Sequence, residues 1–281
     1  MRMIAFSIKA GLFPLFFWLP ASYHTPPAAV GAAFAGLLTK VGVYALIRVF
    51  TLLFHSASPA LFALLLAMST ATMVIGLVAA MNERDFRRIL SFNLVGHIGY
   101  TTASLSLLTP AALAGAIFYV LHHIVVITNL YLVSGVLLKL RRTTDMAGLG
   151  GMYRAQPVFS ALAMIPIFSL AGVPPLSGFL GKLAILEGTF AAGAYWVGGL
   201  VLAVGLLTLL SMGRTWRRAS STAVLSATAE AIEKSMGIRI RRGADSSRSV
   251  VRRFGNTSSG IGVRRAIAST TRPFRQNREL P

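Results

Sequence analysis

The chain has no cysteine, only eight acidic residues and only 12% charged residues among 281. The lack of cysteine excludes disulfides and cysteine-ligated metal sites. The chain has no His-x-x-x-His pair, no phosphate-binding glycine loop, and no serine with an acid partner placed for a triad. His122 and His123 are adjacent, so on a helix they point about 100° apart and do not form a metal site. We therefore expect no metal, no nucleotide cofactor and no enzyme active site.

Apolar residues dominate what is present, and basic residues are unevenly spread. The chain is 55% hydrophobic with a mean hydropathy of +0.69, which is typical of a polytopic membrane protein. Residues 1–213 carry a net charge of +8 and residues 214–281 carry +11. This division predicts a membrane domain over 1–213 and a basic, disordered cytoplasmic tail over 214–281, with one weak helix at 221–236. The tail lacks interleaved aromatic residues, so we expect contact with anionic lipid and no nucleic acid.

Seven apolar stretches approach the roughly 20 residues that a membrane span needs, and they predict an all-α bundle of about seven helices. They are 3–19, 27–54, 59–81, 89–108, 110–138, 157–187 and 191–212. Lys and Arg cluster in the connections 82–88 and 139–156 and after 212, whereas 55–58, 108–109 and 188–190 have none. This asymmetry predicts that the basic face is cytoplasmic and that the N-terminus starts outside.

Two of these helices are predicted to be discontinuous, because glycine and proline weaken or remove backbone hydrogen bonds inside a helix. The breaks fall at Gly11 and Pro14 in the first helix, and at Gly172, Pro174, Pro175 and Gly178 in the sixth. Each break lies near a lysine, Lys9 in one case and Lys182 in the other. Paired interruptions beside charged residues indicate a transport site at mid-membrane.

Titratable residues inside the apolar stretches are candidates for a proton path. A cation at the centre of a membrane helix costs about 2.5–3.5 kcal/mol, so the mid-span Lys40 is predicted to be functional. Lys9 lies near a helix start, and snorkelling to the interface is the alternative for it. Histidine passes protons near neutral pH, which favours His123 as a relay member. Further possible members are His97, His122 and Tyr119, for which hydrogen bonding between helices is the alternative.

Residues 9–27 and 36–48 closely resemble the proton-conducting antiporter-like family. This family comprises large subunits of Mrp-type cation/proton antiporters and the pumping membrane subunits of respiratory complex I. Residues 172–182 look most like the D-type branch of the Mrp antiporter subunits. The resemblance covers about residues 1–218. It implies that Lys9, Lys40 and Lys182 match the lysines of the two broken helices and the helix between them, and that His123 matches an intervening histidine.

The same resemblance implies a setting. Protons would be relayed in exchange for Na⁺, Li⁺ or K⁺ by one component of a hetero-oligomer in the bacterial plasma membrane, without a cofactor. By analogy with the family's inverted repeats, residues 59–213 would form one complete five-helix repeat. Family members are about twice as long, and their earlier helices carry a glutamate that pairs with the lysine at position 9. We therefore expect a C-terminal piece that is inactive alone.

Several departures from the family leave alternatives open. Many relatives have lysine where Ile127 stands, and complex I relatives often have glutamate where Lys182 stands. The match stops near Arg218, and the tail has the composition of an out-of-frame reading of GC-rich DNA, which predicts a frameshifted or truncated gene. One alternative is a pumping subunit of NADH-quinone oxidoreductase or of a membrane hydrogenase. The other is a non-transporting structural or degenerate fragment.

Overall fold

The computed structural model describes residues 2–53 and 59–220, so the predicted tail helix at 221–236 lies outside the described residues. Within those ranges the predicted all-α architecture is confirmed. Two helices are discontinuous, and the helix that follows the first break contains two π-helical segments, η1 and η2. The elements are α1 (Arg2–Ala10), α2 (Trp18–Tyr23), α3 (Ala28–Ala33), η1 (Phe34–Leu38), α4 (Thr39–Arg48), η2 (Val49–Leu53), α5 (Pro59–Asn82), α6 (Phe86–Ser106), α7 (Pro110–Arg141), α8 (Met152–Ala155), α9 (Pro157–Ala171), α10 (Ser177–Ala191) and α11 (Tyr195–Ser220).

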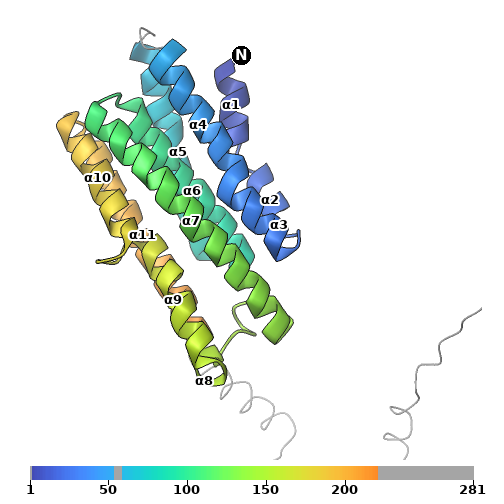
Figure 1. Cartoon of the computed structure of the whole chain (residues 1–281). Helices are drawn as coiled ribbons and strands as arrows, with labels where there is room; N and C mark the ends of the chain where they lie inside the picture. Colours follow the sequence, from blue (N-terminus) through green and yellow to red (C-terminus); the bar gives the residue numbers. More distant parts are fainter. Residues whose placement is uncertain (1, 54–58, 221–281) are drawn as a thin grey trace, which may run out of the picture. The chain divides into compact units, whose positions relative to one another are not determined.

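The bundle is built around α6, in which every residue except Arg88 and Phe92 is buried. Helix α5 packs along α6 on one side, and α7 packs against it on another. Figure 1 shows α1 to α4 on one side of this central group and α9 to α11 on the other. Helices α9 and α10 follow one another end to end, separated by the second break. Each break therefore lies in an outer layer beside the central helices.

Four helical stretches of the described residues are long and apolar enough to cross a membrane: Ala28–Leu52, Pro59–Asn82, Pro110–Arg141 and Tyr195–Ser220. Their outward faces carry exposed large apolar side chains such as Leu64, Leu121 and Leu202, which suit contact with lipid. Helix α6 is less apolar, and its enclosure by other helices explains why it needs no lipid-facing surface. The count of seven spans stays a prediction for α1–α2, α6 and α9–α10.

The basic connections lie on one face, as the charge pattern predicts. The N–H of Phe86 donates to the carbonyl oxygen of Thr144 at 2.9 Å, and the N–H of Met146 donates to that of Arg84 at 3.0 Å. These bonds join the connection before α6 to the connection after α7. Arg218, near the end of α11, lines the same surface hollow as Arg84. All three basic segments therefore meet at one end of the bundle.

Arg87 differs from the prediction, which placed it in a connecting loop. Helix α6 begins at Phe86, so Arg87 lies in its first turn, and only 6% of its surface is exposed. Its guanidinium donates to the carbonyl oxygen of Pro26 at 2.9 Å and to the hydroxyl of Ser134 at 3.2 Å, with a longer contact of 3.4 Å to the carbonyl of His24. Arg87 thus ties the segment between α2 and α3 to α6 and α7.

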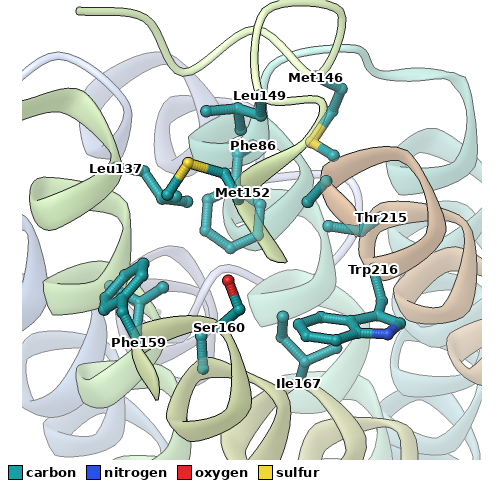
Figure 2. A pocket seen from close by; sticks show the side chains of 13 residues that line it. Phe86, Leu137, Met146, Leu149, Met152, Phe159, Ser160, Ile167, Thr215 and Trp216 are labelled. Atoms are coloured by element: carbon teal, nitrogen blue, oxygen red, sulfur yellow. The ribbon is translucent and has the colours of Figure 1, made fainter. Parts of the chain in front are cut away.

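A small cavity of about 30 Å³ lies near the basic face, between α7, α9 and α11. Figure 2 shows Met152, Phe159 and Trp216 around it, with the hydroxyl of Ser160 directed into the space. The volume has room for about one water molecule. Because it is this small, the cavity is a packing feature.

Candidate functional site

The first break follows α1 and begins at Gly11, whose φ of +82° is accessible mainly to glycine. The N–H of Gly11 donates to the carbonyl of Ile8 at 3.1 Å, and the N–H of Leu12 donates to that of Ser7 at 3.0 Å. This pair of bonds is the Schellman arrangement that closes a helix C-terminus. The peptide bond before Pro14 is cis.

Lys9 lies two residues before this break, and its side chain is exposed on the described bundle. It makes no ion pair with an acidic residue in 2–53 or 59–220. The α1 terminus is instead completed by the indole N–H of Trp18, which donates to the carbonyl of Ile8 at 3.0 Å. The structure therefore does not join Lys9 to the other predicted site residues, and its role stays a prediction.

The second break repeats the local geometry of the first. Gly172 has a φ of +85°, its N–H donates to the carbonyl of Ser169 at 3.1 Å, and the N–H of Val173 donates to that of Phe168 at 3.1 Å. The peptide bond between Pro174 and Pro175 is cis. Both breaks thus share a Gly-x-x-Pro pattern in which glycine closes one helix and a cis proline bond follows two residues later.

Lys182, on α10, turns back to the second break. Its ammonium group donates to the carbonyl of Ala171 at 2.7 Å, with a longer contact of 3.3 Å to that of Leu170. These carbonyls end α9, where the helix dipole is negative and a cation is stabilising. The ammonium also lies 5.8 Å from the centre of the Tyr100 ring on α6, within cation–π range. On its other side, Lys182 borders a groove of about 280 Å³ between α10 and α11.

Lys40 is buried, with 6% of its surface exposed, and this burial is what its mid-span position predicts. Its ammonium group donates to the carbonyl of Ala35 at 3.0 Å and approaches the hydroxyl of Thr39 at 3.4 Å. Ala35 lies in η1, and π-helical turns occur frequently at functional sites. The π turn thus places a backbone acceptor beside a buried cation that has no acidic partner among the described residues.

Three histidines and a tyrosine from α6 and α7 gather in the bundle interior. The ring centres of His97 and His123 are 4.9 Å apart, and Nδ1 of His97 is hydrogen-bonded to the hydroxyl of Tyr119. Tyr119 also lies against the rings of His122 and His123. All four side chains are buried. The structure therefore brings together His123, which the sequence favoured as a relay member, and the three further candidates His97, Tyr119 and His122.

The three histidines share an unusual feature, which is that Nε2 of each is buried without a hydrogen-bond partner. Buried polar atoms are nearly always paired, with protein or with ordered water, so an orphaned set marks a functional candidate. Tyr100, over whose ring the Lys182 ammonium lies, stacks on His97 with ring centres 5.6 Å apart. The histidine cluster thus adjoins the half-buried Lys182, and the electrostatic influence of the buried Lys40 also reaches His97 and His123. No group of three or more potential metal ligands occurs in the described ranges.

Sequence reasoning missed one contact of this cluster. Nδ1 of His122 lies 2.9 Å from the hydroxyl of Ser177, the first residue of α10, and that hydroxyl is 3.3 Å from the hydroxyl of Ser169. Ser177 follows the Pro-Pro-Leu run directly, so its position beside the break was visible in the sequence. Its pairing with a histidine 55 residues earlier depends on how α10 packs on α7 and was not.

The family model described as "NADH:quinone oxidoreductase/Mrp antiporter, TM" matches residues 1–210. The chain belongs to this family. It is 44% identical over 210 residues to the D-type subunit of a Na⁺/H⁺ antiporter of Alkalihalophilus pseudofirmus and 38% identical over 212 residues to that of Bacillus subtilis. In each case the match covers 75% of this chain and 43% of the relative. The chain thus spans less than half the length of the curated family members it matches.

Solved structures of family members show the same fold. A chain of the Mrp complex from Dietzia is 34% identical, with a TM-score of 0.73, and the match covers 76% of this chain and 40% of that one. A chain of respiratory complex I from Thermus thermophilus is 27% identical, with a TM-score of 0.72, and the match covers 78% and 46%. The antiporter members are thus more similar in sequence than this complex I member, although the folds match equally well.

Proposed function

We propose that this chain carries part of the proton path of a monovalent cation/proton antiporter, within a component of the D type. The path would run along Lys40, His123, His97, Tyr119, His122 and Lys182. The observation that carries the proposal is the histidine cluster, whose three Nε2 atoms are buried and unpartnered near the buried Lys40 and the half-buried Lys182. The 44% identity to a D-type antiporter subunit supports cation exchange as the process that the path serves.

The chemistry of the residues suits this role. A neutral imidazole accepts a proton on one ring nitrogen while it releases one from the other, so stacked histidines pass protons without moving far. Water that bridged the unpartnered Nε2 atoms would complete the connections between rings. A lysine in apolar surroundings is disfavoured in its charged form, and an approaching carboxylate favours that form. Each lysine would therefore hold or release its proton according to the state of its neighbours.

Lys9 enters this scheme as a lysine whose counter-charge comes from outside the described residues. The relatives are more than twice as long as the matched region, which leaves room for such a group elsewhere in the complete protein. We place Lys9 at the start of the same relay, beside the first break. We assign Lys9 and the other relay residues to proton transport and propose no catalytic site for this chain.

The proposed setting follows from the relatives and the charge pattern. The chain works with the other subunits of a hetero-oligomeric antiporter in the bacterial plasma membrane and exchanges protons for Na⁺, Li⁺ or K⁺. Its basic face and tail are cytoplasmic, and residues 1–213 form the membrane domain, with 59–213 as one five-helix repeat. Of the predicted tail 214–281, residues 214–220 belong to helix α11 and the rest lies outside the described residues; the basic side chains of this segment are proposed to contact lipid headgroups.

An exchange assay tests the proposal. The antiporter locus that encodes this chain is expressed in cells lacking other antiporters, and dissipation of a pH gradient is followed on addition of Na⁺ or Li⁺. We expect Lys40→Ala, Lys182→Ala and His123→Ala to abolish exchange, while Lys139→Ala, an exposed lysine at the end of α7, leaves it unchanged. Retained exchange in both Lys40→Ala and Lys182→Ala would rule out the relay. The chain expressed alone should show no exchange.

A second candidate is a pumping subunit of a redox complex, which the fold match to complex I supports. This candidate predicts a different response in the same membranes. Proton uptake would follow addition of an electron donor and would not respond to Na⁺ or Li⁺. Lys182, where complex I relatives often have glutamate, and the higher identity to antiporter subunits favour the first candidate.

A further inference from the structure

Ser177 joins an exposed position to the buried histidine cluster. Its own side chain is exposed on the described bundle, whereas His122, to which its hydroxyl is hydrogen-bonded at 2.9 Å, has only 6% of its surface exposed. The geometry is enforced by the next residue. A Cβ added at Gly178 would lie 1.7 Å from the carbonyl oxygen of Ser169, so only glycine lets the first turn of α10 come this close to α9. Of the hydrogen bonds described for the cluster, this one reaches an exposed side chain.

Lys182 does not offer an equivalent connection. Its ammonium group donates to the carbonyls of Leu170 and Ala171, and a backbone carbonyl accepts hydrogen bonds but has no proton to pass on. A serine hydroxyl both accepts and donates, so it can take a proton on one side as it gives one up on the other. In the described residues, the hydrogen bonds of the cluster therefore lead to Ser177 and not to Lys182.

We propose that Ser177 is a port through which the histidine cluster exchanges protons with the outside of the bundle at the second break. This inference rests on the proposed function and adds a residue to it. In the outward direction, His122 gives its Nδ1 proton to the oxygen of Ser177 while the hydroxyl releases its own proton to water, and His122 takes up a new proton at Nε2 from the cluster. Uptake is the reverse, and one proton enters for each that leaves.

This chain has no cysteine, so Ser177→Cys gives it a single thiol, and the parent antiporter treated in the same way reports any reaction elsewhere in the complex. Ser177→Cys is treated with a small cationic methanethiosulfonate reagent, which attaches to the thiol and blocks the position. Exchange should fall at least tenfold and recover when the disulfide is reduced with dithiothreitol. The matched control is Ser22→Cys, because Ser22 is also exposed and its hydroxyl donates only to the backbone carbonyl of Trp18. Equal exchange before and after modification of Ser177→Cys would overturn the port.

Two further variants keep the test decisive if the cysteine variant is inactive from the start. Ser177→Ala should reduce exchange at least tenfold, while Ser177→Thr, which keeps the hydroxyl, should stay within twofold of the parent. On the chain in detergent, ¹⁵N-histidine NMR should show a shift of the His122 Nδ1 signal in Ser177→Ala and not in Ser177→Thr. An unchanged His122 signal in the alanine variant would remove the contact on which the port depends.

The outcomes separate this inference from the function beneath it. If His123→Ala and Lys40→Ala abolish exchange but blocked Ser177→Cys does not, the relay stands and the port is wrong. If the lysine and histidine variants all retain exchange, the relay itself is wrong, although the NMR contact between Ser177 and His122 would still be observed.

Discussion

The two helix breaks are alike in backbone and opposite in how their charges are placed. Gly11 and Gly172 close their helices with the same pair of hydrogen bonds, and a cis proline bond follows each. At the first break the lysine precedes the glycine and is exposed on the described bundle. At the second the lysine follows the glycine and folds back onto the carbonyls at the end of α9. The same backbone motif therefore occurs with an exposed lysine at the first break and with a lysine bound to the end of the preceding helix at the second.

The difference shows which parts of a broken helix are local and which are set by packing. The break needs only glycine and proline at the right spacing, and both copies have them. The carbonyls at the helix ends also need hydrogen-bond donors. An indole N–H donates to one at the first break, and an ammonium group donates to one at the second. A neutral cap leaves Lys9 free to pair elsewhere, whereas the charged cap holds Lys182 in place.

The largest expected loss of stability is at the close approach of α10 to α9, beside the second break. Gly178→Ala forces a Cβ to within 1.7 Å of the Ser169 carbonyl oxygen, which is backbone and has little freedom to move away. We expect a loss of about 3 kcal/mol or more in the free energy of unfolding. Circular dichroism during heating in detergent would measure it.

A matched control for that variant is Gly199→Ala on α11, where an added Cβ meets no atom within 4 Å. Its stability should change by less than about 1 kcal/mol. At the first break, Gly42→Ala should also be strongly destabilising, because its Cβ would approach the backbone of α1 to 2.7 Å. An unfolding temperature of Gly178→Ala equal to that of Gly199→Ala would show that the second break is looser than described.

Arg87 anchors the segment between α2 and α3, one short helix beyond the first break, and has no counterpart at the second break among the residues described. Arg87→Met leaves the carbonyl of Pro26 and the hydroxyl of Ser134 without their donor, and we expect a loss of about 2–4 kcal/mol. Denaturation by SDS in mixed micelles would measure the change. Arg88→Met is the control, because Arg88 is the exposed neighbour on the same turn. Equal effects of the two variants would contradict the anchoring role.

The two lysines should differ in their contributions to stability. Lys182→Met removes the donor to the α9 terminus and should lower the free energy of unfolding by about 1–3 kcal/mol. Lys9→Met, at an exposed position, should stay within about 0.5 kcal/mol of the parent. Thermal unfolding of both variants side by side provides the measurement. If Lys9→Met lowered stability more than Lys182→Met, the contrast between an exposed Lys9 and a Lys182 that stabilises the end of α9 would be wrong.

Among the variants that remove a hydrogen bond, the smallest effect is expected at the neutral cap of the first break. Trp18→Phe removes the indole N–H that bonds the carbonyl of Ile8 but keeps an aromatic ring against Tyr23. The expected loss, measured by the same thermal unfolding, is about 1 kcal/mol, the usual net value of one hydrogen bond. Trp18→Leu, which also removes the ring contact, should cost more, and a smaller loss for leucine than for phenylalanine would count against the cap.

Features governed by local chemistry could be predicted from the sequence. The apolar stretches located the main helices to within a few residues, and glycine and proline located both breaks. Lys40 was expected to be buried because too many apolar residues flank it for its ammonium group to reach an interface. Boundaries were less exact: α6 begins at Phe86 and not at 89, and α11 begins at Tyr195 and extends to Ser220.

Features that depend on packing could not be predicted in this way. Arg87 belongs to a basic run that looks solvated, and its burial requires carbonyls from a segment 61 residues earlier. The π-helical segments carry no distinctive residue, because they arise from the way the helix fits its neighbours. The roles assigned to Lys40, Lys182 and the histidines remain predictions, although the structure brings the histidines together.

The π-helical turn η1 determines which way the side chains that follow it face. A π turn holds one residue more than an α turn, and each helical residue advances by about 100°. Everything after Leu38 is therefore rotated by about one residue relative to an uninterrupted α-helix. In that rotated frame Lys40 is buried, while Val41 and Tyr44 face outward. An uninterrupted α-helix that kept every residue of η1 would turn Lys40 by about 100° away from its buried position, whereas deleting one residue of η1 would restore an α-helical turn and leave Lys40 facing inward.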